Sequence, residues 1–369
     1  MPVRRARQWI ASSRILVAVS VALAGATLVA LRAQGPARPA QPAFRTGTTL
    51  IEVSAIATRG GEVVTDLRAV EVVVRDNGTP QPIVAFEFVD LTAESDSPEQ
   101  RRDFVVVLDD LGTEPKHTRA TQNVALALIQ QLGAHDRLAI LNTGPFELVQ
   151  QLSTDRDAAR SLVRRFRGQK RMAFAQGACH AAAINLRVIS NAARVMGRGR
   201  LERRTILVVS EGQQVYIGAW FGSGNADRCL EARTAYDDVV AATALTNTAV
   251  YGIDPRGLTV SIPVISAPTD REVVAAAGQM AGAATDALEG RYHGSLGLMA
   301  TSTGGTLRTD RNDIAGGIGV MIRDSRQYYR IAYHQPDVPA SELGRPRRIE
   351  VSVTRRDVDV RARRRYMPR

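Results

Sequence analysis

The sequence lacks the short motifs that carry the commonest catalytic chemistry: Gly-x-Ser-x-Gly, His-Glu-x-x-His and the phosphate-binding loop are all absent. Lysine is nearly absent too. Lys116 and Lys170 are the only two, so the net charge of +11 comes from arginines. These arginines are scattered along the whole chain, whereas a nucleic-acid-binding surface gathers its cations on one face. Composition therefore favours neither a common hydrolase nor a nucleic-acid partner, and an apolar fraction of 44% is that of a globular protein.

Long apolar runs are also missing, with one exception near the N-terminus. Ile15–Leu31 follows several arginines and is followed by Ala33, the order of a secretory signal. We expect residues 1–33 to be a signal peptide, residues 34–43 to be a linker, and the mature protein to be periplasmic or secreted. The alternative is that the segment stays uncleaved and anchors the protein in the inner membrane.

Cysteine is scarce, with Cys179 and Cys229 only. An even number of cysteines in an exported protein suits a disulfide. Two isolated buried thiols are the alternative that the count leaves open.

The stretch 44–91 has the pattern of short strands. Thr48–Ala57 alternates apolar and polar residues, and Asp76-Asn-Gly78 between β-branched runs is a strong hairpin signal. So few residues bury too little surface to fold alone. We expect this β-rich accessory domain to be completed by the C-terminal strands in residues 336–369, where Ile349, Val351 and Val353, and then Val358 and Val360, alternate with polar residues.

From Asp103 to residue 335 the pattern changes to alternating strands and helices. Val105–Leu108 and Thr205–Val209 are apolar runs typical of buried parallel strands, and Thr118–Leu132 has apolar residues at helical spacing. Such alternation predicts an α/β fold, a doubly wound and mostly parallel Rossmann-like sheet flanked by helices.

Several short segments, in their order and spacing, resemble exported bacterial proteins with a domain related to von Willebrand factor type A (vWA). The segments are Phe44–Thr46, Val63–Leu67, Asp76–Ile83, Leu108-Asp109, Asp136–Ala139, Leu152–Asp155, Val250–Ile253, Ala300–Gly305, Tyr328–Tyr333 and Val360–Arg363. The resemblance implies a vWA-like sheet over residues 103–335 and a ligand face formed by three loops at its carboxyl edge.

In vWA domains those loops bind a divalent cation, and the first of them reads Asp-x-Ser-x-Ser. Here the same positions are Asp109, Leu111 and Thr113, and the isobutyl group of Leu111 cannot ligate Mg²⁺. Glu211 stands where the third loop offers aspartate. The candidate metal ligands, Asp109, Thr113 and Glu211, thus form a degenerate adhesion site. We expect no cofactor, with Mg²⁺ or Mn²⁺ binding as the alternative.

The same resemblance places Cys179 and Cys229 in two loops of one edge, so it implies that they form a disulfide. It also makes that edge the contact surface for a partner. The residues proposed to bind the partner are Asp110, Tyr216, Trp220 and Phe221, the last three in the glycine-rich loop 213–228.

The expected function is a non-enzymatic, exported protein-interaction or adhesion module that works without a metal ion. Its partner would be a protein of the cell envelope, with no nucleic acid and with membrane contact only through an uncleaved leader. One alternative is cation-dependent ligand binding at Asp109, Thr113 and Glu211. A second is an envelope hydrolase that pairs His180 with Cys179 or Asp109. The arginine-rich C-terminus also leaves binding to an anionic surface open.

Overall fold

The structure is a computed structural model that describes residues 49–92, 101–144, 150–170, 175–196, 203–212, 229–257, 295–309 and 313–368. All of these residues belong to one compact unit, Thr49–Arg369. The predicted leader and linker, residues 1–43, lie outside the described residues. Within the described ranges, no helix combines the length and the apolar character that crossing a membrane requires.

The strands are β1 (Leu50–Arg59), β2 (Glu62–Val63), β3 (Val72–Asp76), β4 (Thr79–Gln81), β5 (Ile83–Asp90), β6 (Asp103–Leu108), β7 (Arg137–Asn142), β8 (Gln150–Ser153), β9 (Arg204–Val209), β10 (Thr248–Ile253), β11 (Leu307–Arg308), β12 (Gln327–His334), β13 (Arg347–Val353), β14 (Asp359–Ala362) and β15 (Arg365–Tyr366). The α-helices are α2 (Thr118–Gln131), α3 (Arg156–Arg165), α4 (Ala175–Val195), α5 (Leu230–Leu245) and α7 (Ile314–Arg326), and a further helix covers residues 295–303. Short 3₁₀ turns are η1 (Ala69–Glu71), η3 (Pro115–His117) and η6 (Ala340–Glu342).

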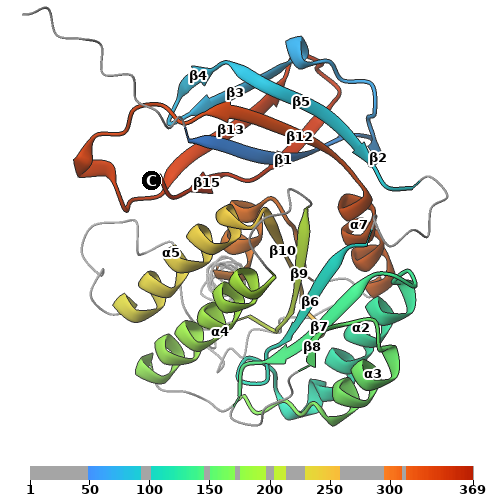
Figure 1. Ribbon diagram of the computed structural model, residues 1–369. Helices are drawn as coiled ribbons and strands as arrows, with labels where there is room; N and C mark the ends of the chain where they lie inside the picture. Colours follow the sequence, from blue (N-terminus) through green and yellow to red (C-terminus); the bar gives the residue numbers. More distant parts are fainter. Residues whose placement is uncertain are drawn as a thin grey trace, which may run out of the picture. The chain divides into compact units, whose positions relative to one another are not determined.

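One sheet has six strands in the order β11-β10-β9-β6-β7-β8 (Figure 1). The first five run parallel, and β8 pairs antiparallel with β7 at one edge. Every residue of β9 and β10 is buried. The Ile-Leu-Val-Val run of β9 is typical of such a strand, because helices cover both faces of a parallel sheet.

Alternate side chains of the central strand β6 enter two separate cores. Val105 and Val107 pack with residues of α4, α5 and the helix at 295–303, whereas Phe104, Val106 and Leu108 pack with residues of α2, α3 and α7. Figure 1 shows these two groups of helices on opposite faces of the sheet. The sheet is therefore fixed from both sides, and its carboxyl edge is left to the loops.

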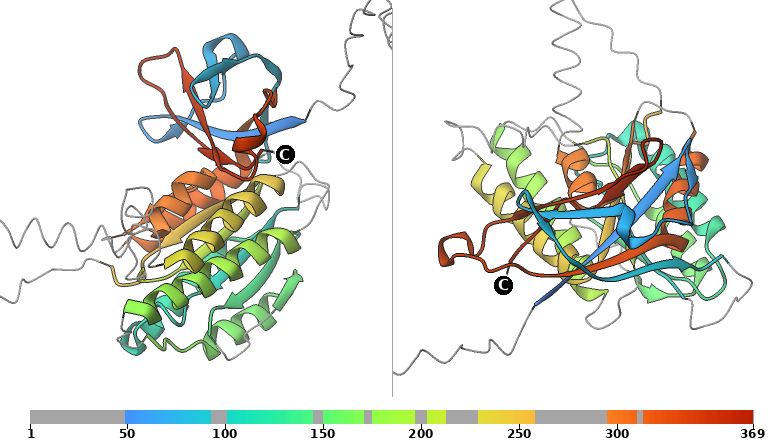
Figure 2. Two further views of the ribbon diagram at one scale, coloured as in Figure 1. Left: turned by 90° about the vertical axis from the view of Figure 1, so that its left-hand side faces the viewer. Right: turned by 90° about the horizontal axis from the view of Figure 1, so that it is seen from above.

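The remaining strands form two antiparallel sheets. A five-stranded sheet has the order β14-β1-β12-β5, with β2 beside β1, and a four-stranded sheet has the order β15-β13-β3-β4. Strands from the two ends of the chain pair here, β1 with β12 and β14, and β3 with β13. Figure 2 shows the blue N-terminal strands among the red C-terminal ones from two further sides.

The predicted fold class, a doubly wound vWA-like or Rossmann-like α/β fold, is wrong. The fold is mixed, since two of its three sheets are antiparallel and the mostly parallel sheet has an antiparallel edge. The main reason is β12. Its alternating residues were assigned to the end of the α/β region, but they pair with β1 and β5 in the antiparallel sheet. A strand's alternation shows that one face is buried, and it does not show which sheet the strand joins.

A buried carboxylate, Asp76, ties the antiparallel sheets together. It ends β3 before the Asn77-Gly78 turn, where both residues have positive φ and confirm the predicted hairpin. Tyr333 of β12 and Tyr366 of β15 donate their hydroxyls to Asp76 Oδ2 at 3.0 and 2.7 Å. Arg347 Nε of β13 donates to Oδ1 at 2.9 Å. One side chain thus connects β3 with three strands from the other end of the chain, β12, β13 and β15.

Candidate functional site

Three loops meet at the carboxyl edge of the six-stranded sheet. They follow β6, β7 and β9, which are neighbours in the sheet and run parallel. Their first polar residues are Asp109, Thr143 and Ser210, all buried. Because the carboxyl ends of parallel strands form the usual binding edge of an open α/β sheet, this is the place to look for a functional site.

Asp109 is the centre of this edge, and protein groups hold both of its carboxylate oxygens. Thr143 Oγ1 donates to Oδ1 at 2.8 Å, and Ser210 Oγ donates to Oδ2 at 2.6 Å. The backbone N–H of Gly112 also donates to Oδ1, at 3.0 Å. A Cβ at Gly112 would lie 2.1 Å from Asp109 Oδ2, so the loop needs glycine at this position. Asp109 is therefore a fully satisfied structural acceptor.

Burial raises the pKa of Asp109, and the hydrogen bonds from Ser210 and Thr143 only partly oppose this rise. The protonated form then stabilises the fold fully below the unfolded pKa of about 3.9, and this stabilisation is lost as the pH rises through the higher folded pKa.

We therefore expect Asp109→Asn to gain stability relative to the wild type as the pH rises, because asparagine does not titrate and loses nothing over this window. Thermal unfolding midpoints of both proteins, measured from pH about 4 to about 7, test this. A difference between the two midpoints that stays constant with pH would contradict it.

Asp110, predicted to bind a partner, is also turned inward. It is 2% exposed, and its Oδ1 accepts from the Thr143 N–H at 3.0 Å. Asn142 Nδ2 and Gln169 Nε2 donate to Oδ2 at 3.2 and 3.1 Å. Thr143 Oγ1 lies 2.8 Å from Oδ1 of both aspartates, and its single proton can serve only one of them at a time. The side chain of Asp110 therefore holds loops together, and it presents little surface to a partner.

Glu211, the third candidate ligand, is 1% exposed, and both of its carboxylate oxygens already have partners. Its Oε1 accepts from the Glu114 N–H at 2.7 Å and lies 2.7 Å from His117 Nδ1. Lys170 Nζ donates to Oε2 at 3.4 Å. A lysine of this chain therefore stands at the carboxylate where a metal ion would be expected.

Sequence reasoning missed Lys170, His117 and Thr143. Lys170 carried a signal, because it is one of only two lysines in an arginine-rich chain. Thr143 carried one too, because it follows an apolar strand that runs parallel to β6.

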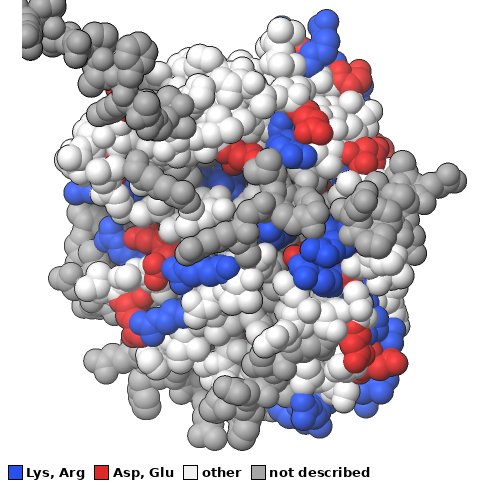
Figure 3. Space-filling model, viewed as in Figure 1, with Lys and Arg blue, Asp and Glu red and all other residues white. Residues whose placement is uncertain are grey.

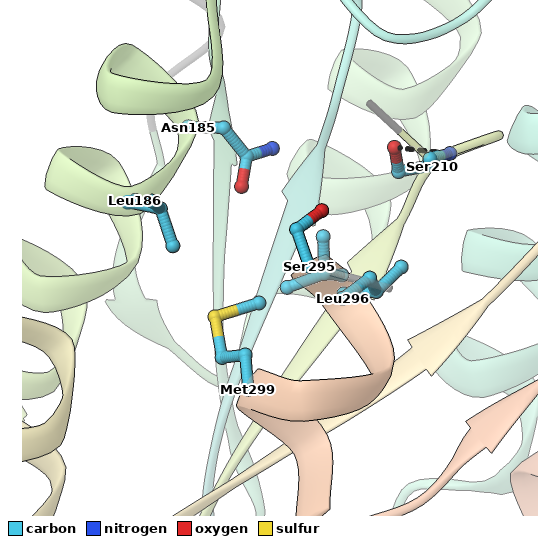
Figure 4. Close-up of a pocket in the computed structure, with 8 residues that line it drawn as sticks. Asn185, Leu186, Ser210, Ser295, Leu296 and Met299 are labelled. Carbon is cyan, nitrogen blue, oxygen red and sulfur yellow. Dashed lines mark hydrogen bonds between the residues drawn. The ribbon is translucent and has the colours of Figure 1, made fainter. Parts of the chain in front are cut away.

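Thr113, the remaining candidate ligand, is fully buried, and its Oγ1 has no hydrogen-bond partner within the described residues. Asn185 Nδ2 is likewise buried without a partner there. Figure 4 shows Asn185 on α4 facing Ser210, Ser295 and Met299 across a small cavity. The cavity measures about 10 Å³, which leaves room for about one water molecule.

The predicted disulfide between Cys179 and Cys229 is confirmed, with the two Cα atoms 5.4 Å apart. It joins the start of α4 to the residue that precedes α5. The bond removes the free thiol that a Cys–His nucleophile requires. His180 contacts Glu231 at 3.4 Å, and this contact chiefly lowers the pKa of that glutamate.

Within the described residues, no group of three or more His, Cys, Asp or Glu side chains is arranged to hold a metal ion. Three other predicted contact residues, Tyr216, Trp220 and Phe221, lie outside the described residues and stay predictions.

No family model matches the chain, and no curated protein matches it. Among solved structures, the PilB minor pilin from Streptococcus sanguinis is 8% identical with a TM-score of 0.36, and the match covers 64% of each chain. A point mutant of that pilin gives a TM-score of 0.34 over the same shares. Three N-terminal domains of the type V pili tip protein Mfa5 from Porphyromonas gingivalis are 13% identical with a TM-score of 0.22, over 46% of this chain and 27% of that one.

This chain thus spans 64% of the length of the PilB structures it matches. Likenesses at these scores do not establish a shared function.

The resemblance to vWA-related proteins is wrong. No family model supports it, and two of the three sheets are antiparallel, unlike the doubly wound sheet that the resemblance implies. The segments behind the resemblance were single turns and strands, such as Asp76–Ile83 and Tyr328–Tyr333. Short turns and alternating strands of this kind occur in many unrelated β-rich proteins. Their order along the chain is therefore weak evidence for membership of one family.

Proposed function

We propose that this protein is an exported, non-enzymatic protein-interaction module that contacts its partner at the carboxyl-edge loops and needs no metal ion there. The carboxyl-edge loops are residues 109–116, 142–144 and 210–212, together with the adjoining segment 213–228. The observation that carries the proposal is the ammonium group of Lys170 on the Glu211 carboxylate.

This contact bears on metal binding because a divalent cation needs carboxylate oxygens that it does not share with another cation. Both Glu211 oxygens already have partners, and both Asp109 oxygens accept hydroxyl donors. A cation entering this edge would have to displace a lysine from a buried carboxylate, and Mg²⁺ also loses its own hydration reluctantly. The internal contacts instead fix the loops in one arrangement without a ligand, and such preorganisation favours binding of a partner.

Capture from a cell-envelope fraction by the immobilised full chain tests the proposal. We expect the partner to be retained in EDTA and to be lost from Trp220→Ala/Phe221→Ala, because aromatic side chains on such loops carry a large share of contact energy. Val195→Ala is the control. Val195 is 79% exposed and is the last residue of α4, at the end of that helix away from Cys179. Release by EDTA would contradict metal independence. Equal capture by the aromatic variant and the wild type would contradict the surface.

Cation-dependent binding is the second candidate, and the buried, unpartnered Thr113 Oγ1 is the observation that favours it. Calorimetric titration with Mg²⁺ and Mn²⁺ of the wild type and of Asp109→Ala separates the two candidates. The leading proposal expects no heat of binding from either protein. Heat from the wild type that disappears in Asp109→Ala would support the cation site.

A further inference from the structure

Four exposed arginines gather where α3 ends and α2 begins. They are Arg119 in the first turn of α2, Arg164 and Arg165 in the last turn of α3, and Arg167 just beyond it. We call these four residues the arginine surface.

Hydrogen bonds between the two helices hold this corner together. Gln122 Nε2 donates to the carbonyls of Arg164 and Phe166 at 3.0 and 3.1 Å, and the Gly168 N–H donates to Thr118 Oγ1 at 3.0 Å. Thr118 and Gln122 flank Arg119 on α2, so the start of α2 lies along the end of α3. Arg167 Nη1 donates to the carbonyls of Arg164 and Phe166 at 2.9 and 2.7 Å, so this guanidinium group also lies at the end of α3. The four arginines therefore belong to one corner of the molecule.

Several other exposed arginines have carboxylate partners, whereas Arg345, Arg356 and Arg364 near the C-terminus have no ion pair among the described residues. Arg59 pairs with Asp357 at 2.6 Å, Arg187 with Glu231 at 2.8 Å, and Arg348 with Glu350 at 2.6 Å. On the face seen in Figure 3, basic and acidic side chains are accordingly interspersed. Among the described residues, no ion pair involves any member of the arginine surface.

The helices themselves supply little negative charge. α2 contains no Asp or Glu, and the one acidic residue of α3, Asp157, pairs with Arg160 in the first half of that helix. Helix electrostatics explain only part of the cluster. Arg164 and Arg165 suit the negative C-terminal end of α3, but Arg119 lies at the positive N-terminal end of α2, where a cation is unfavourable. A structural role does not account for Arg119.

The arginine surface adjoins the carboxyl-edge loops. The backbone N–H groups of Gln169 and Lys170 donate to the carbonyls of Asp110 and Thr113 at 2.7 and 2.9 Å. A partner that contacts these loops would therefore lie within reach of the four guanidinium groups. Guanidinium groups bind carboxylates through paired hydrogen bonds, so they suit a partner that presents several of them.

We propose that the arginine surface recognises an acidic, carboxylate-rich segment of the protein that docks at the carboxyl-edge loops. This inference rests on the proposed function. A protein partner fits better than a lipid surface, because the exposed large apolar side chains of the described residues lie outside α2 and α3, and stable membrane binding generally takes a second, apolar signal.

Fluorescence polarisation of a fluorescein-labelled polyglutamate peptide with the full chain tests the inference. We expect binding that weakens strongly between about 50 and about 300 mM NaCl. Arg164→Glu/Arg165→Glu should weaken it about tenfold or more, since each reversal replaces an attraction by a repulsion. Arg119→Glu should weaken it too, and it places an acid at a helix N-terminus, where it favours folding.

Arg187→Glu/Arg194→Glu is the matched control. It changes the net charge by the same amount, but on α4, which packs on the other face of the six-stranded sheet from α2 and α3. We expect it to leave the affinity within about twofold. Equal losses in the two double variants would mean that only net charge acts, and would overturn the inference. Binding to phosphatidylglycerol vesicles without binding to the peptide would also overturn it, in favour of a lipid surface.

The capture experiment separates this inference from the proposed function. If Trp220→Ala/Phe221→Ala loses the partner while Arg164→Glu/Arg165→Glu keeps it, the interaction module stands and the acidic partner is wrong. If both keep the partner while the peptide still binds at the arginines, the proposed contact loops are wrong and the anion-binding surface stands.

Discussion

Asp76→Ala is expected to lower the free energy of unfolding by about 3–5 kcal/mol, because it removes one partner from a buried charged network. Asp76 is fully buried, and Arg347, Tyr333 and Tyr366 all donate to it. Burial raises the pKa of both tyrosines, so their hydroxyls keep their protons and need an acceptor. A folded protein typically has only about 5–15 kcal/mol of stability in total, so this one change would remove a large part of it.

Urea unfolding followed by circular dichroism measures this loss as a lower midpoint. Asp357→Ala is the matched control, since Asp357 pairs with Arg59 at the surface, where its side chain is 63% exposed. It should leave the midpoint nearly unchanged. Asp76→Asn should fall between the two, because the amide oxygen can still accept one tyrosine hydroxyl. Equal midpoints for Asp76→Ala and Asp357→Ala would show that the carboxylate does not hold the sheets together.

Asp76 also shows which parts of this structure the sequence reveals. Its place before Asn77-Gly78 predicted the hairpin correctly, because a tight turn depends on neighbouring residues alone. Its role as an acceptor for β12, β13 and β15 could not be predicted, since those strands lie more than two hundred residues away. Local conformation follows from local chemistry, whereas partners across a core depend on the whole topology.

At the carboxyl edge, too, the sequence predicted where residues lie but not what they contact. The sequence located Asp109 and Glu211 after two buried strands, and both lie at that edge. Residue type suggested cation ligands, since carboxylates are what divalent cations bind. In the structure these carboxylates contact side chains of the protein instead. Asp109 accepts hydrogen bonds from Ser210 and Thr143, and Glu211 contacts His117 and Lys170. Spacing along the chain carries no information about such donors, because each comes from a different loop.

Removal of the disulfide by Cys179→Ala/Cys229→Ala is expected to destabilise the protein by about 4 kcal/mol in the chain-entropy model, since the bond closes a loop of 50 residues. In this model the loss of stability arises chiefly in the unfolded state, where the bond joins the two ends of the loop and so limits the conformations of the chain. A smaller part comes from the folded state, because Cys229 packs against the core beneath α4 and α5. Guanidinium unfolding of the variant and of the oxidised wild type measures the difference as a shift in midpoint.

The reduced wild type supplies the control for this variant. Reduction breaks the bond and keeps both sulfur atoms in the core. The reduced protein should therefore unfold at a slightly higher guanidinium concentration than the alanine variant and at a much lower one than the oxidised protein. The same reductant should leave the variant unchanged. The bond also closes the segment that contains Tyr216, Trp220 and Phe221, so reduction should weaken partner capture before the protein unfolds. If reduction changed neither the midpoint nor the capture, the bond would contribute neither to the fold nor to the arrangement of the contact loops.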